Sequence, residues 1–227
     1  MKNELNMTRM IQLSVLALIV AFAISGYAWL QLPAGEQIPV HFDASGQPDR
    51  YGGKFEGLMM LPLVMAGMCV LLAVLPRIDP RRSNIAASMK AYQMVWGGTL
   101  IFMMIIHVVV ILNVLGYIVN AVTFIPFGIG ILFVVIGNFL GKTRSNWFMG
   151  IKTPWTLSSD LAWDKTHRLG GKLFIALGIF FSLSGFIGVS ERWFGLLTGG
   201  VLVMTVFLYG YSYYIWKNDP NKLEVGS

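Results

Sequence analysis

The sequence has few of the residues on which soluble folds and catalytic sites depend. Lys, Arg, Asp and Glu make up 12% of its 227 residues, against roughly 25% in an average soluble domain. Its single cysteine, Cys69, excludes an internal disulfide, and three histidines are few for a metalloenzyme. These shortages exclude a disordered tail, a disulfide-rich secreted module and an ordinary soluble enzyme. Apolar residues, in contrast, make up 56% of the chain, and the mean hydropathy is +0.66.

Six apolar segments are long enough to cross a membrane as helices. A bilayer core takes about 20 largely apolar residues per helix, and it forces every backbone amide to find its partner within the protein. Lys90 and Lys142 enclose 51 residues without charge, which is room for two spans and a turn. The sequence therefore predicts an all-α integral membrane protein whose spans are Met10–Leu30, Leu58–Leu75, Met94–Leu115, Val122–Leu140, Leu173–Val189 and Trp193–Trp216.

The basic residues predict the orientation of these spans. Short cytoplasmic loops carry an excess of Lys and Arg. With the N-terminus inside, 14 of the 17 Lys and Arg residues lie inside, and only Arg50, Lys54 and Arg192 lie outside. The sequence thus predicts an N-in, C-in topology. The net charge of +6 is therefore a topology signal, with attraction to anionic lipid as a by-product, and it requires no binding to nucleic acid.

Two connections are longer than a turn, and each belongs to one predicted unit. The extracytoplasmic loop, residues 31–57, lies in an N-terminal two-helix unit, residues 1–75. The cytoplasmic loop, residues 141–172, lies in a C-terminal four-helix unit, residues 76–227. In the outer loop, Pro-Val-His-Phe predicts an extended stretch and Asp43-Ala-Ser-Gly predicts a turn.

The inner loop contains signals for a short helix. Its expected N-caps are hydroxyl side chains, and the helix runs through Trp163 to His167. Asp160, Asp164 and His167 have the spacing i, i+4 and i+7, which predicts one polar face. The hydroxyl residues offered as N-caps are Thr156, Ser158 and Ser159.

Both long loops end in a similar string. Arg50-Tyr-Gly-Gly-Lys54-Phe precedes the second span, and Arg168-Leu-Gly-Gly-Lys172-Leu-Phe precedes the fifth. Each string follows the first span of a three-helix half, and the halves have opposite orientations, which is the pattern of a 3+3 inverted repeat. Coincidence is the alternative, because Gly-Gly beside cations is common at membrane surfaces.

The histidines do not predict a metal centre. His41 and His167 are separated by the membrane core, roughly 30 Å thick, so that one zinc ion cannot bind both. His41, Asp43 and Asp49 offer a weak divalent-ion site, but turn chemistry in the loop is the favoured interpretation. We expect no metal and no cofactor.

Nothing in the sequence favours catalysis. Cys69 has no neighbouring cation in the sequence that would activate its thiol, which favours a packing role. Ser158, Ser159 and Asp160 precede His167, but helix capping explains them as well as a triad does, and no nucleophile-elbow motif is present. We therefore expect a protein that is not an enzyme.

Three intramembrane polar residues, His107, Asn113 and Asn138, leave two interpretations open. One is a proton- or ligand-responsive site, and the other is an interhelical hydrogen bond worth under about 2 kcal/mol. The first would suit a small-molecule or lipid transporter with a mid-membrane site near His107, which is the alternative function. The predicted spans contain no Asp, Glu, Lys or Arg, which counts against ion coupling.

Two motifs carry a family resemblance. The inner loop reads Asn146-Trp-Phe-Met-Gly-Ile-Lys-Thr-Pro-Trp-Thr-Leu-Ser-Ser-Asp160, then Trp163-Asp-Lys-Thr-His-Arg168 and Gly170. This string resembles the SdpI family, the immunity proteins against the sporulation-delay peptide toxin, which usually have Arg where Lys152 stands and often Glu near Asp160. The outer stretch, residues 38–52, is similar to the small domain of unknown function often found at the start of these proteins.

The resemblance implies a function with two sides. It implies a multi-pass protein of the bacterial inner membrane that confers immunity to a secreted antimicrobial peptide, senses that peptide and recruits a cytoplasmic transcriptional repressor. The expected partners are membrane lipid, the peptide toxin and the repressor, with no direct contact to nucleic acid. We expect the outer contacts to be His41, Asp43, Asp49, Arg50 and Tyr51. The expected inner residues are Asn146, Gly150, Lys152, Thr153, Pro154, Trp155, Asp160, Asp164, His167 and Arg168.

Overall fold

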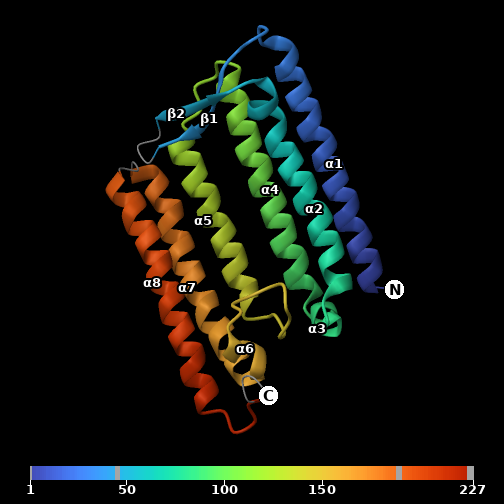
Figure 1. The fold of residues 1–227 in the computed structure, drawn as a ribbon, viewed down its shortest axis with the longest axis vertical. Helices are drawn as coiled ribbons and strands as arrows, with labels where there is room; N and C mark the ends of the chain where they lie inside the picture. Colours follow the sequence, from blue (N-terminus) through green and yellow to red (C-terminus); the bar gives the residue numbers. More distant parts are fainter. Residues whose placement is uncertain (1, 44–46, 188–190, 224–227) are drawn as a thin grey trace.

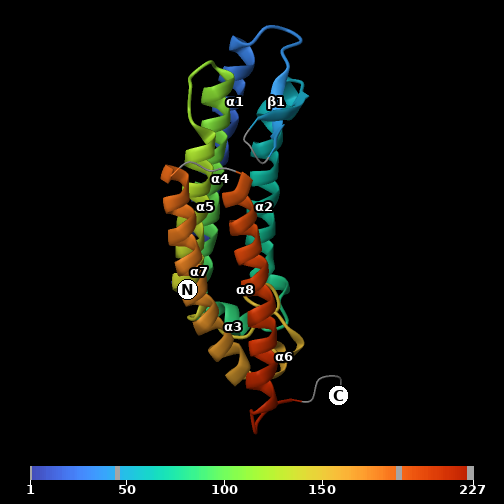
Figure 2. The ribbon, with the colours of Figure 1, turned by 90° about the vertical axis from the view of Figure 1, so that its left-hand side faces the viewer.

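The computed structural model describes residues 2–43, 47–187 and 191–223 as a bundle of long helices. In chain order the elements are α1 (Lys2–Gln31), β1 (Ile38–Phe42), β2 (Pro48–Gly52), the π-helical turn η1 (Phe55–Met59), α2 (Met60–Ile78), α3 (Arg82–Ala87), α4 (Met89–Val114), α5 (Ala121–Leu140), α6 (Pro154–Ser158), α7 (Asp160–Ile187) and α8 (Glu191–Lys217). The long helices lie side by side in a slab that is broad in Figure 1 and narrow in Figure 2.

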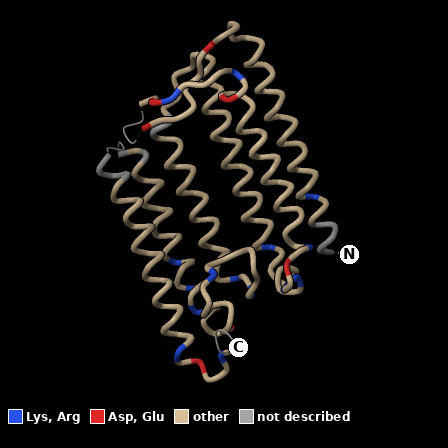
Figure 3. Tube along the Cα trace, viewed as in Figure 1, with Lys and Arg blue, Asp and Glu red and all other residues tan. Residues whose placement is uncertain are grey.

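The slab has two distinct ends. The β1–β2 hairpin lies at one of them, called here the hairpin end (Figure 1). Helices α3 and α6 lie at the other, called here the loop end, where α1 begins and α8 ends. Most of the Lys and Arg residues that Figure 3 shows gather at the loop end, whereas the hairpin end carries Arg50 and Lys54 beside acidic residues.

Among the described residues, five helices are long and apolar enough to cross a membrane, and they overlap five of the six predicted spans. These helices, called here the spanning helices, are Met7–Gln31, Phe55–Ile78, Met89–Val114, Thr123–Leu140 and Gly195–Lys217. In their most apolar windows only 22–33% of the residues are buried inside the protein. Since most apolar side chains face outward, the surface suits lipid rather than water.

The predicted fifth span, Leu173–Val189, falls within α7 and is not among these five helices. The first part of α7 is polar, because Asp160, Asp164 and Lys172 lie in it. The last residues of the predicted span, 188 and 189, lie outside the described residues. The inner loop therefore ends earlier than predicted: α7 begins at Asp160 and runs on to Ile187, so that no separate short helix ends at His167.

The two similar strings adopt different structures. Arg50, Tyr51 and Gly52 belong to strand β2, and Lys54 leads into the π-helical turn η1. The string that starts at Arg168 is helical throughout, inside α7. The two strings therefore have similar amino-acid sequences but different local conformations.

Glycines bring α5 and α7 into close contact. A Cβ atom added at Gly137 would lie 2.6 Å from the carbonyl oxygen of Gly171, and one added at Gly178 would lie 2.6 Å from the carbonyl oxygen of Gly130. The pairs Gly130/Gly137 and Gly171/Gly178 are each seven residues apart, so that they fall on one face of their helices. Small residues let membrane helices approach until their backbones touch. This contact fixes α7 to the centre of the bundle.

The outer loop adds a small β-hairpin to the predicted all-α fold. The extended Pro-Val-His-Phe stretch is confirmed as part of β1, which pairs with β2 in antiparallel register, His41 opposite Arg50. Residues 44–46 of the predicted turn lie outside the described residues. Ile38 is buried against η1, because a Cβ atom at Gly57 would lie 2.6 Å from its side chain. The hairpin is therefore attached to the top of α2.

Candidate functional site

The inner loop folds around the buried amide of Asn146. Its Nδ2 donates to the carbonyl oxygens of Arg144 and Met149 at 2.9 and 3.0 Å. Its Oδ1 accepts from the backbone N–H groups of Phe148 and Met149 at 3.0 and 2.7 Å. The side chain is fully buried, and these four bonds use its whole hydrogen-bonding capacity. Asn146 thus sets the path of the chain from residue 144 to residue 149.

His167 joins this loop to α7. Its Nε2 accepts from the backbone N–H of Ile151 at 2.9 Å, and its Nδ1 lies 2.8 Å from the carbonyl oxygen of Trp163. The two partners assign the proton to Nδ1, because an N–H donor needs an unprotonated Nε2. Trp163 stacks on the imidazole with 3.9 Å between ring centroids and donates from Nε1 to the carbonyl of Thr143 at 2.8 Å.

Burial keeps His167 neutral. Its side chain is fully buried, and desolvation lowers its pKa to about 4, although the bond to the Trp163 carbonyl favours the protonated form. Gly150 lies directly over the ring: its φ is +124°, and a Cβ atom there would be 2.3 Å from Nε2 of His167. Only glycine fits both the backbone angle and the space.

Helix α6 attaches the loop to α8. The Thr153 hydroxyl accepts from the backbone N–H of Thr156 at 3.1 Å, and Pro154 occupies the first helical turn, where its missing N–H costs nothing. Thr153 also bonds to the hydroxyl of Ser212 in α8 at 3.0 Å. Beside it, the Trp155 ring lies 4.7 Å from the ring of Tyr209 of α8.

The connection between α2 and α4 holds the loop from the other side. Asp79 accepts from the backbone N–H of Trp147 at 3.0 Å, and Asn84 donates to the carbonyl oxygen of Ser145 at 2.7 Å. Arg81 donates to the hydroxyl of Ser145 and, at 2.9 Å, to the carbonyl oxygen of Leu157. Sequence reasoning missed these residues. The Asp79-Pro80 turn signal was visible, but no local pattern shows which loop a side chain will meet.

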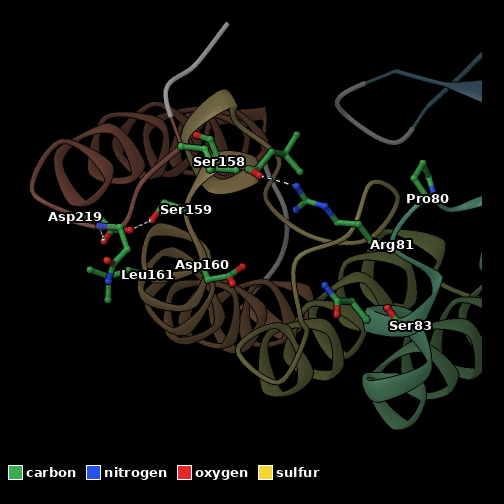
Figure 4. A pocket seen from close by; sticks show the side chains of 12 residues that line it. Pro80, Arg81, Ser83, Ser158, Ser159, Asp160, Leu161 and Asp219 are labelled. Atoms are coloured by element: carbon green, nitrogen blue, oxygen red, sulfur yellow. Dashed lines mark hydrogen bonds between the residues drawn. The ribbon is translucent and has the colours of Figure 1, made fainter. Parts of the chain in front are cut away.

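A pocket of about 600 Å³ opens between this connection and the start of α7 (Figure 4). Arg81 lies on one side of it, and Ser158, Asp160 and Asp219 lie on the other. Ser159 caps α7 by accepting from the backbone N–H of Ala162 at 2.9 Å, and its own hydroxyl donates to Asp219. That bond and one from the backbone N–H of Asn221 hold the pKa of Asp219 below its usual value. The pocket thus presents a guanidinium opposite carboxylates.

The expected inner residues divide into a buried and an exposed set. Asn146, Thr153 and His167 are buried, and Gly150 and Trp155 are half-buried. The exposed residues are Lys152, Pro154, Asp160, Asp164 and Arg168. The predicted single polar face on α7 is therefore wrong for His167, which lies on the buried side with Trp163, whereas the carboxylates face outward. Of the three expected N-caps, only Ser159 caps α7, and Thr153 caps α6 instead.

The hairpin brings its charged residues together on an exposed surface. Nδ1 of His41 lies 2.6 Å from Oδ1 of Asp49, and Arg50 donates to Glu56 at 2.6 Å. The Asp43 carboxylate accepts from the backbone N–H of Gln47 at 2.9 Å, which is turn chemistry as favoured above. The side chain of Tyr51 is 55% exposed. Within the described residues no group of three or more His, Cys, Asp or Glu side chains is arranged to hold a metal ion.

The intramembrane polar residues do not share a site. Nε2 of His107 lies 3.1 Å from both the Ser25 hydroxyl and the carbonyl oxygen of Ala21, and Ser25 donates to the carbonyl oxygen of Leu58 at 2.7 Å. These bonds join α1, η1 and α4, as the interhelical interpretation predicted. Asn113 lies in the last turn of α4 and Asn138 in the last turn of α5, at opposite ends of the slab (Figure 1). The three do not line one mid-membrane cavity.

Known proteins match both regions of the chain. Residues 142–212 match the SdpI/YfhL protein family, and residues 16–66 match the domain of unknown function DUF1648. The first match confirms the resemblance to the SdpI family, and the second confirms the similarity of the outer stretch to a small domain of unknown function. The chain is also 24% identical over 174 residues to Immunity protein SdpI of Bacillus subtilis (strain 168), covering 77% of this chain and 80% of that protein. No solved structure matches.

The SdpI-like region contains the inner loop from Lys142 onward, α6, α7 and most of α8. The DUF1648 region contains most of α1, the hairpin and the first part of α2. Together with the five apolar helices, these matches make the chain a multi-pass protein of the bacterial cell membrane.

Proposed function

We propose that this SdpI-like chain is a membrane immunity protein that protects a bacterium against a secreted antimicrobial peptide. The observation that carries the proposal is its similarity to Immunity protein SdpI over 77% of the chain, with the inner loop inside the matched region. The similarity to an immunity protein points to a role that is not enzymatic.

The proposed topology has six spans with both termini inside. Helix α7 supplies the sixth crossing, and its polar first part lies in the cytoplasm. Two observations support this arrangement: α1 begins and α8 ends at the loop end, and Lys and Arg gather there (Figures 1 and 3). The two-unit division at residue 75 and the inverted repeat remain part of the proposal. The repeat would superpose α1, α2 and α4 on α5, α7 and α8 after inversion.

The hairpin is the proposed peptide-facing surface. Its aromatic side chains Phe42 and Tyr51 are 46% and 55% exposed, and Phe55 at the start of η1 is 58% exposed. The His41–Asp49 and Arg50–Glu56 pairs lie in the same segment. A membrane-active peptide is amphipathic, and exposed rings beside charges of both signs are a suitable surface for one. The proposed contacts are His41, Asp43, Asp49, Arg50 and Tyr51.

The loop end is the proposed surface for a cytoplasmic repressor. Asp160, Asp164 and Arg168 are exposed on α7, and Lys152 is exposed in the inner loop before it. The pocket of Figure 4 opens beside Asp160. A ligand carries a signal only if it binds two states of the bundle with different affinity. Because both carboxylates are exposed on the proposed repressor surface, Asp160→Asn with Asp164→Asn should abolish repressor recruitment and leave protection intact.

The experiment measures survival and membrane potential of toxin-sensitive bacteria that express the chain and receive the sporulation-delay peptide. Maintained potential at doses that depolarise control cells supports the proposal. Tyr51→Ala should lose protection at normal abundance. Its matched control is Tyr117→Ala, because Tyr117 is also an exposed tyrosine at the hairpin end, 62% exposed. Equal killing with and without the protein, at confirmed expression, removes this peptide as the ligand.

A further inference from the structure

A second cavity, of about 340 Å³, lies near the loop end of the bundle. Helices α2, α4, α5 and α7 form its walls through Leu72, Val95, Ile136 and Phe174, among others. The inner loop closes it with residues 148–151. Its volume is in the range of cavities that hold small ligands.

The cavity offers no free polar side chain to a ligand. Tyr92 and Thr143 are the polar side chains in its lining. The Tyr92 hydroxyl donates to the carbonyl oxygen of Leu72 at 2.5 Å, and the Thr143 hydroxyl donates to that of Leu140 at 2.7 Å. Water needs several polar partners to stay in such a space. The cavity therefore suits an apolar ligand.

Two cations lie directly on lining residues. Nζ of Lys142 is 4.6 Å from the ring centroid of Phe139, and Nζ of Lys152 donates to the carbonyl oxygen of Phe148 at 3.3 Å. Both lysines are exposed, and Phe148 itself is 37% exposed. Two exposed ammonium groups thus contact residues that line the apolar cavity.

We propose that the cavity binds one acyl chain of an anionic phospholipid from the leaflet at the loop end, with its phosphate held by Lys142 and Lys152. Three of the wall helices, α2, α4 and α5, are spanning helices, and their loop-end turns form the cavity, which places it at the depth of acyl chains beneath the headgroups. Lysines at the membrane surface attract the headgroups of anionic lipid. The proposal does not depend on the immunity function.

Occupancy of this cavity bears on the inner loop. Gly150 and Ile151 line the cavity, and the backbone N–H of Ile151 is bonded to His167. A bound chain therefore packs against the segment that His167 holds in place. Lipid composition and inner-loop order are coupled at this point.

The test measures lipid retention by native mass spectrometry, on protein purified from vesicles of phosphatidylcholine with or without phosphatidylglycerol. We expect one phosphatidylglycerol per chain. Each lysine contributes about fivefold to retention, so that Lys142→Gln with Lys152→Gln should lose about 25-fold. The matched control is Lys165→Gln with Lys172→Gln, which neutralises two exposed lysines of α7 outside the cavity. Val95→Phe should fill the cavity and abolish retention, and Val203→Phe on the outer face of α8 should not.

Equal losses in both double-lysine variants, or equal retention of phosphatidylcholine, would overturn the proposal. A second measurement on the unaltered chain covers the case in which Val95→Phe does not fold: phosphatidylglycerol with a photoreactive acyl chain should label residues 136–151. Labelling confined to the outer face of α8 would also overturn it. If the unaltered chain retains phosphatidylglycerol but gives no immunity, the result would count against the proposed function alone.

Discussion

The backbone N–H of Ile151 donates to Nε2 of His167 across a distance of 2.9 Å. One neutral imidazole thereby accepts from the inner loop and donates to its own helix, while Trp163 covers its face. The spacing in the sequence predicts that His167 shares a polar face with Asp160 and Asp164, but His167 is buried and supports the inner loop.

Replacement of His167 should destabilise the protein. His167→Ala leaves the backbone N–H of Ile151 without its partner, removes the side-chain bond to the carbonyl of Trp163 and opens a cavity beside Trp163. We expect these losses to lower the free energy of unfolding by about 3 kcal/mol. Asp164→Ala, on the exposed side of α7, should change it by less than about 0.5 kcal/mol. Thermal unfolding in detergent and abundance in membranes measure both. Normal stability of His167→Ala would show that the loop does not depend on this bond.

The free energy of unfolding should decrease as the pH falls below 6.5, the ordinary pKa of histidine. The pKa of His167 is lowered from 6.5 to about 4 in the folded chain, so that the unfolded chain binds the proton more tightly. Stability from this group is therefore complete above pH 6.5 and is lost as the pH falls towards 4, by about 3 kcal/mol in all. Unfolding measured from pH 8 to pH 4 should show this slope, and His167→Ala should flatten it. An unchanged slope in the variant would assign it to other groups.

A methyl group at residue 150 should disrupt the loop. Gly150→Ala forces an L-residue to a φ of +124° and places Cβ 2.3 Å from His167, with a strain of about 1–3 kcal/mol before the clash is added. Gly210→Ala is the matched control, because nothing lies within 4 Å of a Cβ atom there and alanine favours a helix interior. Proteolysis of the inner loop should be faster only in Gly150→Ala. Equal resistance of the inner loop to proteolysis in Gly150→Ala and Gly210→Ala would contradict the strained geometry.

The spans were predictable from sequence because lipid makes one strong demand, a long run of apolar residues. That demand places five predicted segments in spanning helices. It fails at α7, where polar residues from Asp160 to Lys172 continue into the same helix as the apolar part. The change in hydropathy at Leu173 predicts that a span begins there, whereas the hydrogen-bonded backbone of α7 continues through this residue.

The site was predictable as a set of residues but not as an arrangement. The resemblance identified Asn146, Gly150 and His167, yet the sequence gives no sign that they are supports rather than contacts. Asp79 and Arg81 were missed because their partners, Trp147 and Leu157, are more than 60 residues away along the chain. Contacts of this range depend on how the helices pack, which no local spacing records.

The glycine contact between α5 and α7 should be sensitive to the smallest side chain. Gly171→Ala places Cβ 2.6 Å from the backbone carbonyl of Gly137, so that the two helices must separate along a face with no flexible side chain to yield. We expect a loss of about 1–3 kcal/mol, the range for overpacking a tight interior. Gly200→Ala, whose Cβ would meet only the side chain of Leu177 at 3.5 Å, should be neutral or stabilising. Thermal unfolding of both variants in the same detergent decides the matter, and equal stability would show that α5 and α7 do not pack backbone to backbone.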